Sequence, residues 1–272
     1  WAASPRPVAA EHGMVVSAHH LATEAGVDIL QRGGNAIDAA VAVAYVLAVT
    51  YPEAGNIGGG GFMTIRMADG RSTFIDFREM APGAASATMF QDAAGNVVPG
   101  RSTRAYLAAG IPGTVAGLEL ARTRFGTMAR QPVMAEAIRL ARDGFILNDG
   151  DATFLAEGAE DFAKDPASAA IFLNHGQVWN AGERLVQADL GRTLAAIARD
   201  GADAFYRGAI AQRIVAASQA HGGIMAMADF AAYRAVERVP IECDYRGFHV
   251  ISAPPPSSGG IVLCEALNIL SG

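Results

Sequence analysis

Apolar residues recur along the chain with distinct periods, and the period at each point predicts the local element. Residues 21–32 carry apolar side chains at three- to four-residue intervals, which is typical of an amphipathic helix, and a Gly-Gly pair follows as a stop signal. Asn35 can cap a second helix that runs to about residue 50. Asp38 falls in the first turn of that helix, where the helix dipole favours an acid.

A glycine run followed by two strand patterns is the most distinctive stretch. Glycines occupy positions 58–61, and the apolar run 62–67 and the alternating run 72–77 are separated by an Ala-Asp-Gly turn, which predicts a hairpin. Pro82 cannot extend a sheet ladder, so the second strand should stop near Arg78. This places a guanidinium at a strand end, where a cleft could form, and makes Arg78 the leading candidate site residue.

The rest of the chain is mainly helical. Residues 84–103 are polar and rich in turn formers, which predicts a surface excursion. Helices are expected over residues 112–124, 131–142, 149–163, 190–199, 203–220, 227–232 and 259–270. Two further strands are expected at 235–243 and 248–253. Few strands among many helices indicate an α+β or α/β fold.

Composition and charge exclude several classes of function. The chain has 272 residues, of which 51% are hydrophobic and 18% charged, so it can form a substantial core and should not be disordered. A net charge of −6 with scattered arginines argues against nucleic acid as a partner. The longest uncharged run, 39–49, is shorter than the roughly 20 residues of a membrane span. The histidines show no metal-ligand spacing, so we expect neither a metal nor another cofactor.

Two pairs of potentially reactive residues have simple structural interpretations. Cys243 falls in an expected strand and Cys264 in an expected helix; they could pair, but we expect two buried thiols that act as small hydrophobes. His19 and His20 are adjacent, which on a helix turns their side chains about 100° apart. We expect both to be surface or helix-start residues.

Two glycine-containing segments could bind anions. The run 58–61 lacks the lysine and hydroxyl of a phosphate-binding loop, and the dinucleotide-binding pattern fails at Met63, so we expect a close approach of backbones instead. Residues 256–260 begin a helix whose amides could bind an anion. A helix capped by Ser257-Ser258 and packed closely through its glycines is the favoured interpretation.

A series of strings resembles the γ-glutamyltranspeptidase family of N-terminal-nucleophile hydrolases. GNIGGGGFM at 55–63 and DFREMAP at 76–82 are the most distinctive. The remaining matches follow in the family's order: GIPGTVAG (110–117), LARDGF (140–145), AFYRG (204–208), AAYRAVERVPI (231–241) and PPPSSGG (254–260). The resemblance implies an α+β fold, the αββα sandwich of the family, whose sheets are completed by a second chain. Residues 1–12 would be an N-terminal tail, and 13–272 the large-subunit part of a single domain.

The resemblance also implies that the catalytic residue lies on another chain. Enzymes of this class attack with the side chain of an N-terminal residue whose own α-amine is the base. Trp1 cannot do this, and no threonine here has the family's processing context. The chain is thus similar to the large subunit of an autoprocessed precursor, partnered by a small subunit that begins with the nucleophilic threonine. Trp1 indicates a processed or trimmed start, and the chain ends after LNIL (267–270), short of that subunit's usual end.

In such an enzyme a γ-glutamyl group passes from glutathione or a related donor to the threonine, and then to water or an acceptor amine. The resemblance implies that Arg78 holds the donor's α-carboxylate, since a guanidinium makes two parallel charge-assisted bonds that lysine cannot reproduce. Glu79 would orient Arg78, contact the donor's amino group or, as the favoured option, be a structural partner. From its residues alone Arg78 would be an ordinary ion pair, with Asp76 on the same strand face.

Two alternatives differ in activity. A related acylase, similar to cephalosporin acylase, would use the same scaffold on another acyl group, and a degenerate homologue would only bind or scaffold. The arginine of the FREMAP string favours a donor that carries an α-carboxylate. Hydrolysis and transfer are not distinguished, because the acceptor site should lie largely on the second chain. Enzymes of this family are commonly exported, which implies a periplasmic or secreted protein.

Overall fold

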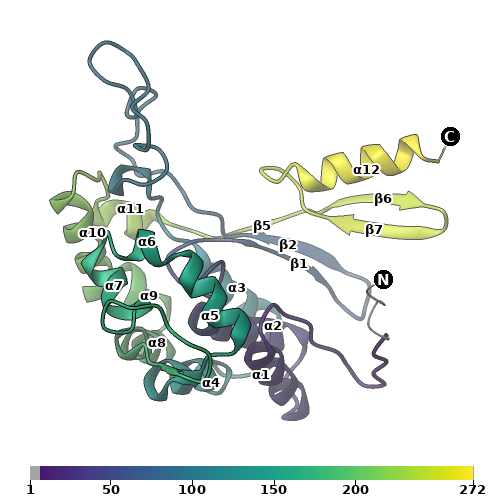
Figure 1. Cartoon of the computed structure of the whole chain (residues 1–272). Coiled ribbons are helices and arrows are strands. Elements are labelled where there is room, and N and C mark those ends of the chain that lie inside the picture. The colour runs from purple at the N-terminus through teal and green to yellow at the C-terminus, as the bar shows by residue number, and fades with distance from the viewer. Residues whose placement is uncertain (1–6, 272) are drawn as a thin grey trace, which may run out of the picture. The chain divides into compact units, whose positions relative to one another are not determined.

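The computed structural model describes residues 7–271. Figure 1 shows its helices and strands, coloured by residue number. Internal contacts divide the chain into two compact units, each built from two stretches of sequence. Unit 1 comprises the described residues up to Gly55 together with Gly126–Arg192, and unit 2 comprises Asn56–Phe125 with the described residues from Thr193 onward. Within residues 7–271 no helix combines the length and the apolarity needed to cross a membrane.

Three helices form the core of unit 1. The first two are α1 (His20–Gln31) and α2 (Ala36–Thr50), both as predicted, and α2 packs against α1 and against α4 (Arg130–Asp143). The apolar side chains between them are fully or almost fully buried, among them Ala22, Val41, Val46, Met134 and Ala137. The small residues of α2 allow this helix to be covered on more than one side.

Asp38 fixes the start of α2. Its carboxylate accepts hydrogen bonds from the backbone N–H groups of Asn35, Thr127 and Met128 and from the Thr127 hydroxyl. Burial on its own would raise the pKa of Asp38, but the hydrogen bonds from Thr127, Asn35 and Met128 outweigh it and hold the pKa below its usual value. The prediction that Asn35 caps α2 is confirmed. Asp38 also connects α2, through its hydrogen bonds to Thr127 and Met128, to the segment that precedes α4.

The remainder of unit 1 departs from the sequence prediction in detail. The expected helix 149–163 is two helices, α5 (Asp149–Glu157) and α6 (Ala159–Phe162). Gly158 ends the first helix, and the ring of Phe162 occupies the space that a side chain at position 158 would need. Three short elements were not predicted: α7 (Pro166–Phe172) and the paired strands β3 (Phe145–Ile146) and β4 (Arg184–Leu185). A two-residue strand carries no periodicity to detect.

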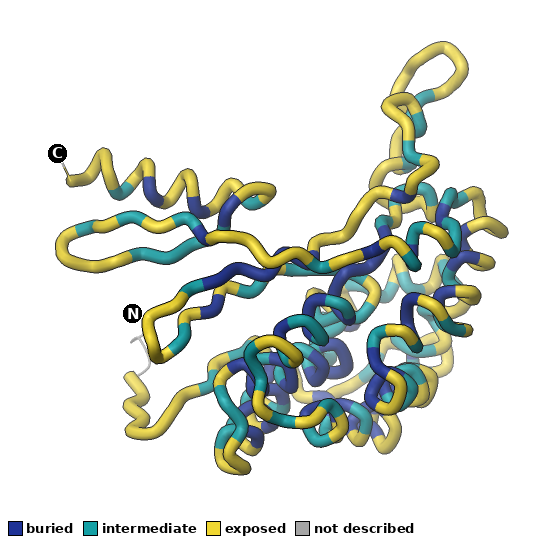
Figure 2. The backbone as a smooth tube through the Cα atoms, turned by 180° about the vertical axis from the view of Figure 1, so that it is seen from behind, coloured by how far each residue is buried: buried dark blue, intermediate teal, exposed yellow. Residues whose placement is uncertain are grey.

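A three-stranded antiparallel sheet organises unit 2. Strand β2 (Ser72–Asp76) lies between β1 (Phe62–Arg66) and β5 (Val236–Arg238). The hairpin between β1 and β2 closes at Gly70, whose positive φ of 89° suits glycine, as the Asp-Gly signal predicts. As the central strand, β2 is buried along most of its length, which Figure 2 shows as a dark blue stretch.

The expected strand 235–243 is wrong as a single element. It is two strands in different sheets: β5 pairs with β2, whereas β6 (Ile241–Tyr245) pairs with β7 (Phe248–Ser252). Pro240 separates them because it has no N–H to continue a ladder. The β6–β7 turn consists of Arg246 and Gly247, both at positive φ, so β6 extends beyond the predicted end at residue 243.

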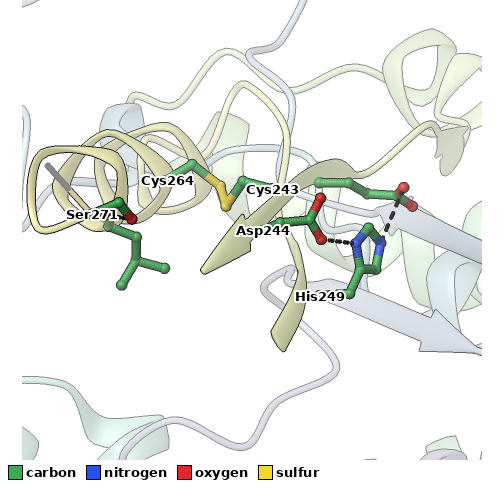
Figure 3. The surroundings of a disulfide bond; sticks show 7 residues. Cys243, Asp244, His249, Cys264 and Ser271 are labelled. Atoms are coloured by element: carbon green, nitrogen blue, oxygen red, sulfur yellow. Dashed lines mark hydrogen bonds and ion pairs between the residues drawn. A yellow bond between two sulfur atoms is a disulfide. The ribbon is translucent and has the colours of Figure 1, made fainter. Parts of the chain in front are cut away.

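The last helix, α12 (Gly259–Ile269), packs on the β6–β7 hairpin and is bonded to it covalently. Cys243 of β6 forms a disulfide with Cys264 of α12, so the expectation of two free buried thiols is wrong (Figure 3). Hairpin and helix bring the two Cα atoms within 5.9 Å, a proximity that cysteine spacing does not reveal. The close packing expected of Gly260 is confirmed, since a Cβ atom there would lie 2.2 Å from the Ala253 carbonyl oxygen.

Helices complete unit 2. The expected helix 203–220 is interrupted at Gly208, and the short helix expected at 227–232 has the predicted bounds. The remaining elements of unit 2 are η1 (Tyr106–Ala108), α3 (Thr114–Phe125), α9 (Ala202–Tyr206), α10 (Ala209–Ala220) and α11 (Met227–Ala232). Helix α8 (Ala188–Asp200) begins in the sequence of unit 1 and continues into that of unit 2. Residues 84–103 contain no buried position and form the extended, mostly exposed loop of Figure 2, as predicted for a surface excursion.

Candidate active-site segment around Arg78

Arg78 lies two residues beyond the end of β2, and its side chain is exposed. Within residues 7–271 no protein group forms a hydrogen bond or ion pair with its guanidinium. Asp76, the partner that an ordinary ion pair would use, is instead paired with Arg238, whose Nε lies 2.8 Å from its Oδ2. The interpretation of Arg78 as one half of an ion pair with Asp76 is therefore wrong.

The main chain of Arg78, in contrast, is held at both ends. Its N–H donates to Oδ1 of Asp76 at 3.1 Å, and its carbonyl oxygen accepts a hydrogen bond of 2.8 Å from the hydroxyl of Tyr233. Asp76 and Tyr233 are only 8% and 5% exposed. The backbone is thus fixed by buried side chains, while the guanidinium extends to where a ligand can reach it.

The glycine run packs against this segment. Gly61 and Phe77 exchange both backbone hydrogen bonds, which extends the β1–β2 ladder to the residue next to Arg78. A Cβ atom on Gly60 would lie 2.6 Å from the Phe77 carbonyl oxygen and 2.8 Å from the Glu79 nitrogen. The predicted close approach of backbones is confirmed. Positions 58–61 do not have positive φ, so the requirement for glycine at Gly60 is one of space.

The GIPGTVAG string, residues 110–117, also packs against this segment. Together with the glycine run 58–61 it forms what we call the clamp on residues 77–80. The N–H groups of Gly113 and Thr114 donate to the carbonyl oxygen of Gly59, at 2.7 and 3.1 Å. A Cβ atom on Gly113 would lie 1.9 Å from the Phe77 carbonyl oxygen, and the start of α3 therefore approaches the segment as closely as the glycine run does. Ile111 and Met80 exchange backbone hydrogen bonds one residue beyond Glu79. Motifs far apart in the sequence thus enclose residues 77–80.

Glu79 is exposed next to Arg78. Its Oε2 lies over Gly60, 2.9 Å from the position of a Cβ atom there, and no hydrogen bond or ion pair of its carboxylate is found among residues 7–271. Its role stays a prediction. Burial, and next the negative charges of Asp76 and Glu79, raise the pKa of Tyr233 well above its usual value. The Tyr233 hydroxyl therefore keeps its proton and remains a donor.

His19 differs from expectation in one respect. It starts α1 as predicted, with Nδ1 accepting from the Leu21 N–H, but it is buried and its Nε2 lies 3.3 Å from Oδ1 of Asp151. Burial lowers the pKa of His19 more than Asp151 raises it. His19 lines a cavity of about 370 Å³ in unit 1, with Tyr51 and Phe154 among the aromatic walls. No cluster of three or more potential metal-binding side chains occurs in the described part of the chain.

Solved structures define the class of protein to which this fold belongs. γ-Glutamyltranspeptidase from Helicobacter pylori superposes with a TM-score of 0.95 at 43% identity, covering 98% of this chain and 76% of that one. Cephalosporin acylase from Bacillus halodurans superposes with a TM-score of 0.83 at 28% identity, covering 93% of this chain and 47% of that one. The expected class, the α+β fold of the N-terminal-nucleophile hydrolases, is confirmed.

The family follows from the sequence comparison. The family model described as Gamma-glutamyltranspeptidase matches residues 22–272, so the chain belongs to the γ-glutamyltranspeptidase family. A glutathione hydrolase proenzyme from Pseudomonas sp. (strain A14) is 59% identical over 272 residues, which is 100% of this chain and 47% of that protein. The chain thus spans about half the length of the curated relatives it matches.

Proposed function

We propose that this chain is the donor-binding part of a glutathione hydrolase or γ-glutamyltransferase, and that Arg78 holds the α-carboxylate of the γ-glutamyl donor. One observation carries the proposal: the Arg78 guanidinium is exposed and has no protein partner among residues 7–271, although its main chain is tethered at both ends. Asp76, the carboxylate on the same face of the strand, is occupied by Arg238. The positive charge of Arg78 is therefore available to an anionic ligand.

The chemistry of the donor fits this arrangement. A γ-glutamyl compound carries an α-carboxylate several bonds from the carbonyl that reacts, so a positive group can anchor one end while the other is attacked. A guanidinium fork binds a carboxylate through two parallel hydrogen bonds, which fixes orientation as well as position. Such an anchor is effective only if it is held rigidly, and the clamp on residues 77–80 provides that rigidity.

The nucleophile, in this account, is a threonine at the start of a second chain cut from the same precursor. Its hydroxyl oxygen forms an ester with the γ-carbonyl carbon, and the C–N bond of the donor breaks as the leaving amine takes a proton. Water or an acceptor amine then attacks the ester, takes the γ-glutamyl group and returns the hydroxyl. Support comes from the relatives, which are named proenzymes and are about twice the length of this chain.

An acylase acting on another acyl group is the second candidate. The observation that favours it is the structural similarity to cephalosporin acylase from Bacillus halodurans. The free guanidinium favours the γ-glutamyl donor, because an acyl group without a carboxylate would leave Arg78 unused. Activity on γ-glutamyl-p-nitroanilide and on a cephalosporin side-chain amide, measured on one preparation, separates the two candidates.

Export to the periplasm or the medium belongs to the same proposal. The Cys243–Cys264 disulfide supports it, because disulfides persist in oxidising compartments and are rare in the cytosol.

The direct test replaces Arg78 by alanine in the complete processed enzyme. Loss of a desolvated carboxylate partner costs roughly 2–5 kcal/mol, so kcat/KM for γ-glutamyl-p-nitroanilide should fall about 30-fold to several thousand-fold, with a raised KM. Arg78→Lys should recover only part of this. Arg71→Ala is the matched control, because Arg71 is an exposed arginine of the same hairpin that pairs with the adjacent Asp69. Near-normal kcat/KM in Arg78→Ala would refute the anchor role.

A further inference from the structure

Tyr233 reaches the Arg78 segment from a distant part of the sequence. It immediately follows α11, 155 positions beyond Arg78, and its hydroxyl donates to the Arg78 carbonyl oxygen at 2.8 Å. Its ring stacks on that of Tyr206, with centroids 5.6 Å apart and planes 5° from parallel. The Tyr206 hydroxyl is itself fixed, donating to the Pro112 carbonyl oxygen at 2.8 Å and accepting from the Ala116 N–H at 3.2 Å. It is the parallel stack of the two rings, which a phenylalanine at position 206 would keep, and not the Tyr206 hydroxyl, that gives the donor on Tyr233 a well-defined position.

The surroundings leave the Tyr233 hydroxyl little freedom. A Cβ atom on Gly113 would lie 2.1 Å from its oxygen, so the chain leading into α3 closes over it. On the other side of the same residue, Asp76 accepts from the Arg78 N–H, and Arg238 holds the second carboxylate oxygen. Both peptide groups of Arg78 are thus oriented by side chains, although the Arg78 side chain forms no hydrogen bond or ion pair of its own within residues 7–271.

We propose that Tyr233 is a positioning residue for Arg78: by fixing the Arg78 carbonyl group it sets the direction of the guanidinium and so the enzyme's preference for donors that carry an α-carboxylate. The inference rests on the proposed function. A small rotation of the peptide at residue 78 is amplified along the long arginine side chain, and a two-pronged carboxylate contact tolerates little displacement. Tyr233 would then act on the binding of one substrate group without touching the substrate.

The test compares two donors on the same preparation of the complete enzyme. One is γ-glutamyl-p-nitroanilide, and the other is its decarboxylated analogue, 4-aminobutyryl-p-nitroanilide, which lacks only the α-carboxylate. The ratio of their kcat/KM values measures carboxylate preference and does not depend on how much of the enzyme is folded. In Tyr233→Phe the ratio should fall about three- to tenfold, the range expected for loss of one neutral hydrogen bond. The fall should come mainly from a higher KM for the carboxylate-bearing donor, with the analogue little affected.

Tyr206→Phe is the matched control, since it removes a buried tyrosine hydroxyl from the same stack without removing a bond to Arg78. Its ratio should equal that of the wild type. An unchanged ratio in Tyr233→Phe, or an equal fall in Tyr206→Phe, would overturn the inference. If Tyr233→Phe gives no soluble enzyme, Tyr233→His removes the same hydroxyl while keeping an aromatic ring, and an unchanged ratio there overturns the inference as well.

Arg78→Ala, assayed with the same two donors, separates this inference from the function on which it rests. If Arg78→Ala abolishes the carboxylate preference and Tyr233→Phe retains it, only the role of Tyr233 is wrong. If Arg78→Ala retains the preference, the anchor role of Arg78 is wrong and the proposed function loses its main support.

Discussion

A ligand-binding arginine has to combine an immobile main chain with a side chain that the protein leaves unpaired. At Arg78 the carboxylate of Asp76 and both flanking backbone groups have other partners. Asp76 is paired with Arg238 and accepts from the Arg78 N–H, and Tyr233 satisfies the carbonyl oxygen. The feature that indicates a ligand is the combination of an exposed guanidinium without a protein partner among residues 7–271 and a main chain fixed by buried side chains.

Gly60 and Gly58 allow the clamp to be tested with a single added methyl group. Gly60→Ala would drive a Cβ atom against backbone atoms of Phe77 and Glu79, and such overpacking costs about 1–3 kcal/mol. We expect a lower melting temperature by calorimetry and a reduced yield of processed enzyme. Gly58→Ala is the control, because a Cβ atom there meets nothing within 4 Å. Equal melting temperatures for the two variants would show that the run is a loose loop.

Sequence patterns located Arg78 but not the residues that hold it. Pro82 marks the end of β2 and the FREMAP string marks the arginine, and both signals are local. Tyr233 lies within a string used for the family resemblance, yet no periodicity links it to a carbonyl group 155 positions away. Asp76 was assigned the wrong partner, because alternation along a strand identifies side chains on the same face and says nothing of competitors from β5.

At the scale of elements, amphipathic helices and the first hairpin were predictable because their signals are periodic and end at Gly, Pro or a capping residue. Prediction failed where one residue interrupts a pattern that otherwise continues, as at Gly158, Gly208 and Pro240. Pro240 has the largest consequence, since it separates the strand paired with β2 from the strand bonded to α12. The sequence periodicity is the same before and after Pro240, so only the strand pairing distinguishes β5 from β6.

The β6–β7–α12 segment depends on its disulfide. Among its residues only Pro254, Gly260 and Cys264 are buried, so apolar burial contributes little to its stability within this chain. Replacing Cys243 and Cys264 by serine opens a loop with a sequence separation of 21. The loop-entropy relation gives a loss of about 3 kcal/mol. We expect faster backbone hydrogen exchange across residues 241–271, reproduced by reduction of the wild-type protein, with no change in β1 and β2. Unchanged exchange in 241–271 would show that the hairpin and helix hold together without the bond.

At the scale of the whole molecule, this chain leaves apolar groups and strand edges uncovered. Phe248 and Ile269 are 73% and 79% exposed, and β1 and β5 each pair on one side only within residues 7–271. Open edges and exposed apolar residues promote aggregation. A second chain that supplies further strands would cover them, which agrees with relatives about twice this length. The division into a tail at 1–12 and one domain part at 13–272 stays a prediction, and residues 1–6 lie outside the described range.

The family resemblance predicted more of the whole molecule than any physical pattern did. Composition and periodicity reach only an α+β or α/β fold, because hydrophobic spacing does not specify which strands pair or in what order. The ordered strings reach the family, which the match over residues 22–272 confirms.

The proposed division of labour, with the anchoring arginine on this chain and the nucleophile on another, is tested most directly by reconstitution. Residues 1–272 are expressed alone and together with a C-terminal chain that begins with threonine, and each product is examined by sedimentation and by turnover of γ-glutamyl-p-nitroanilide. We predict that the chain alone is poorly soluble and inactive, and that co-expression yields an active heterodimer whose activity is lost in Arg78→Ala. A monodisperse monomer of residues 1–272 that hydrolyses the donor far above the buffer rate would contradict the two-chain account.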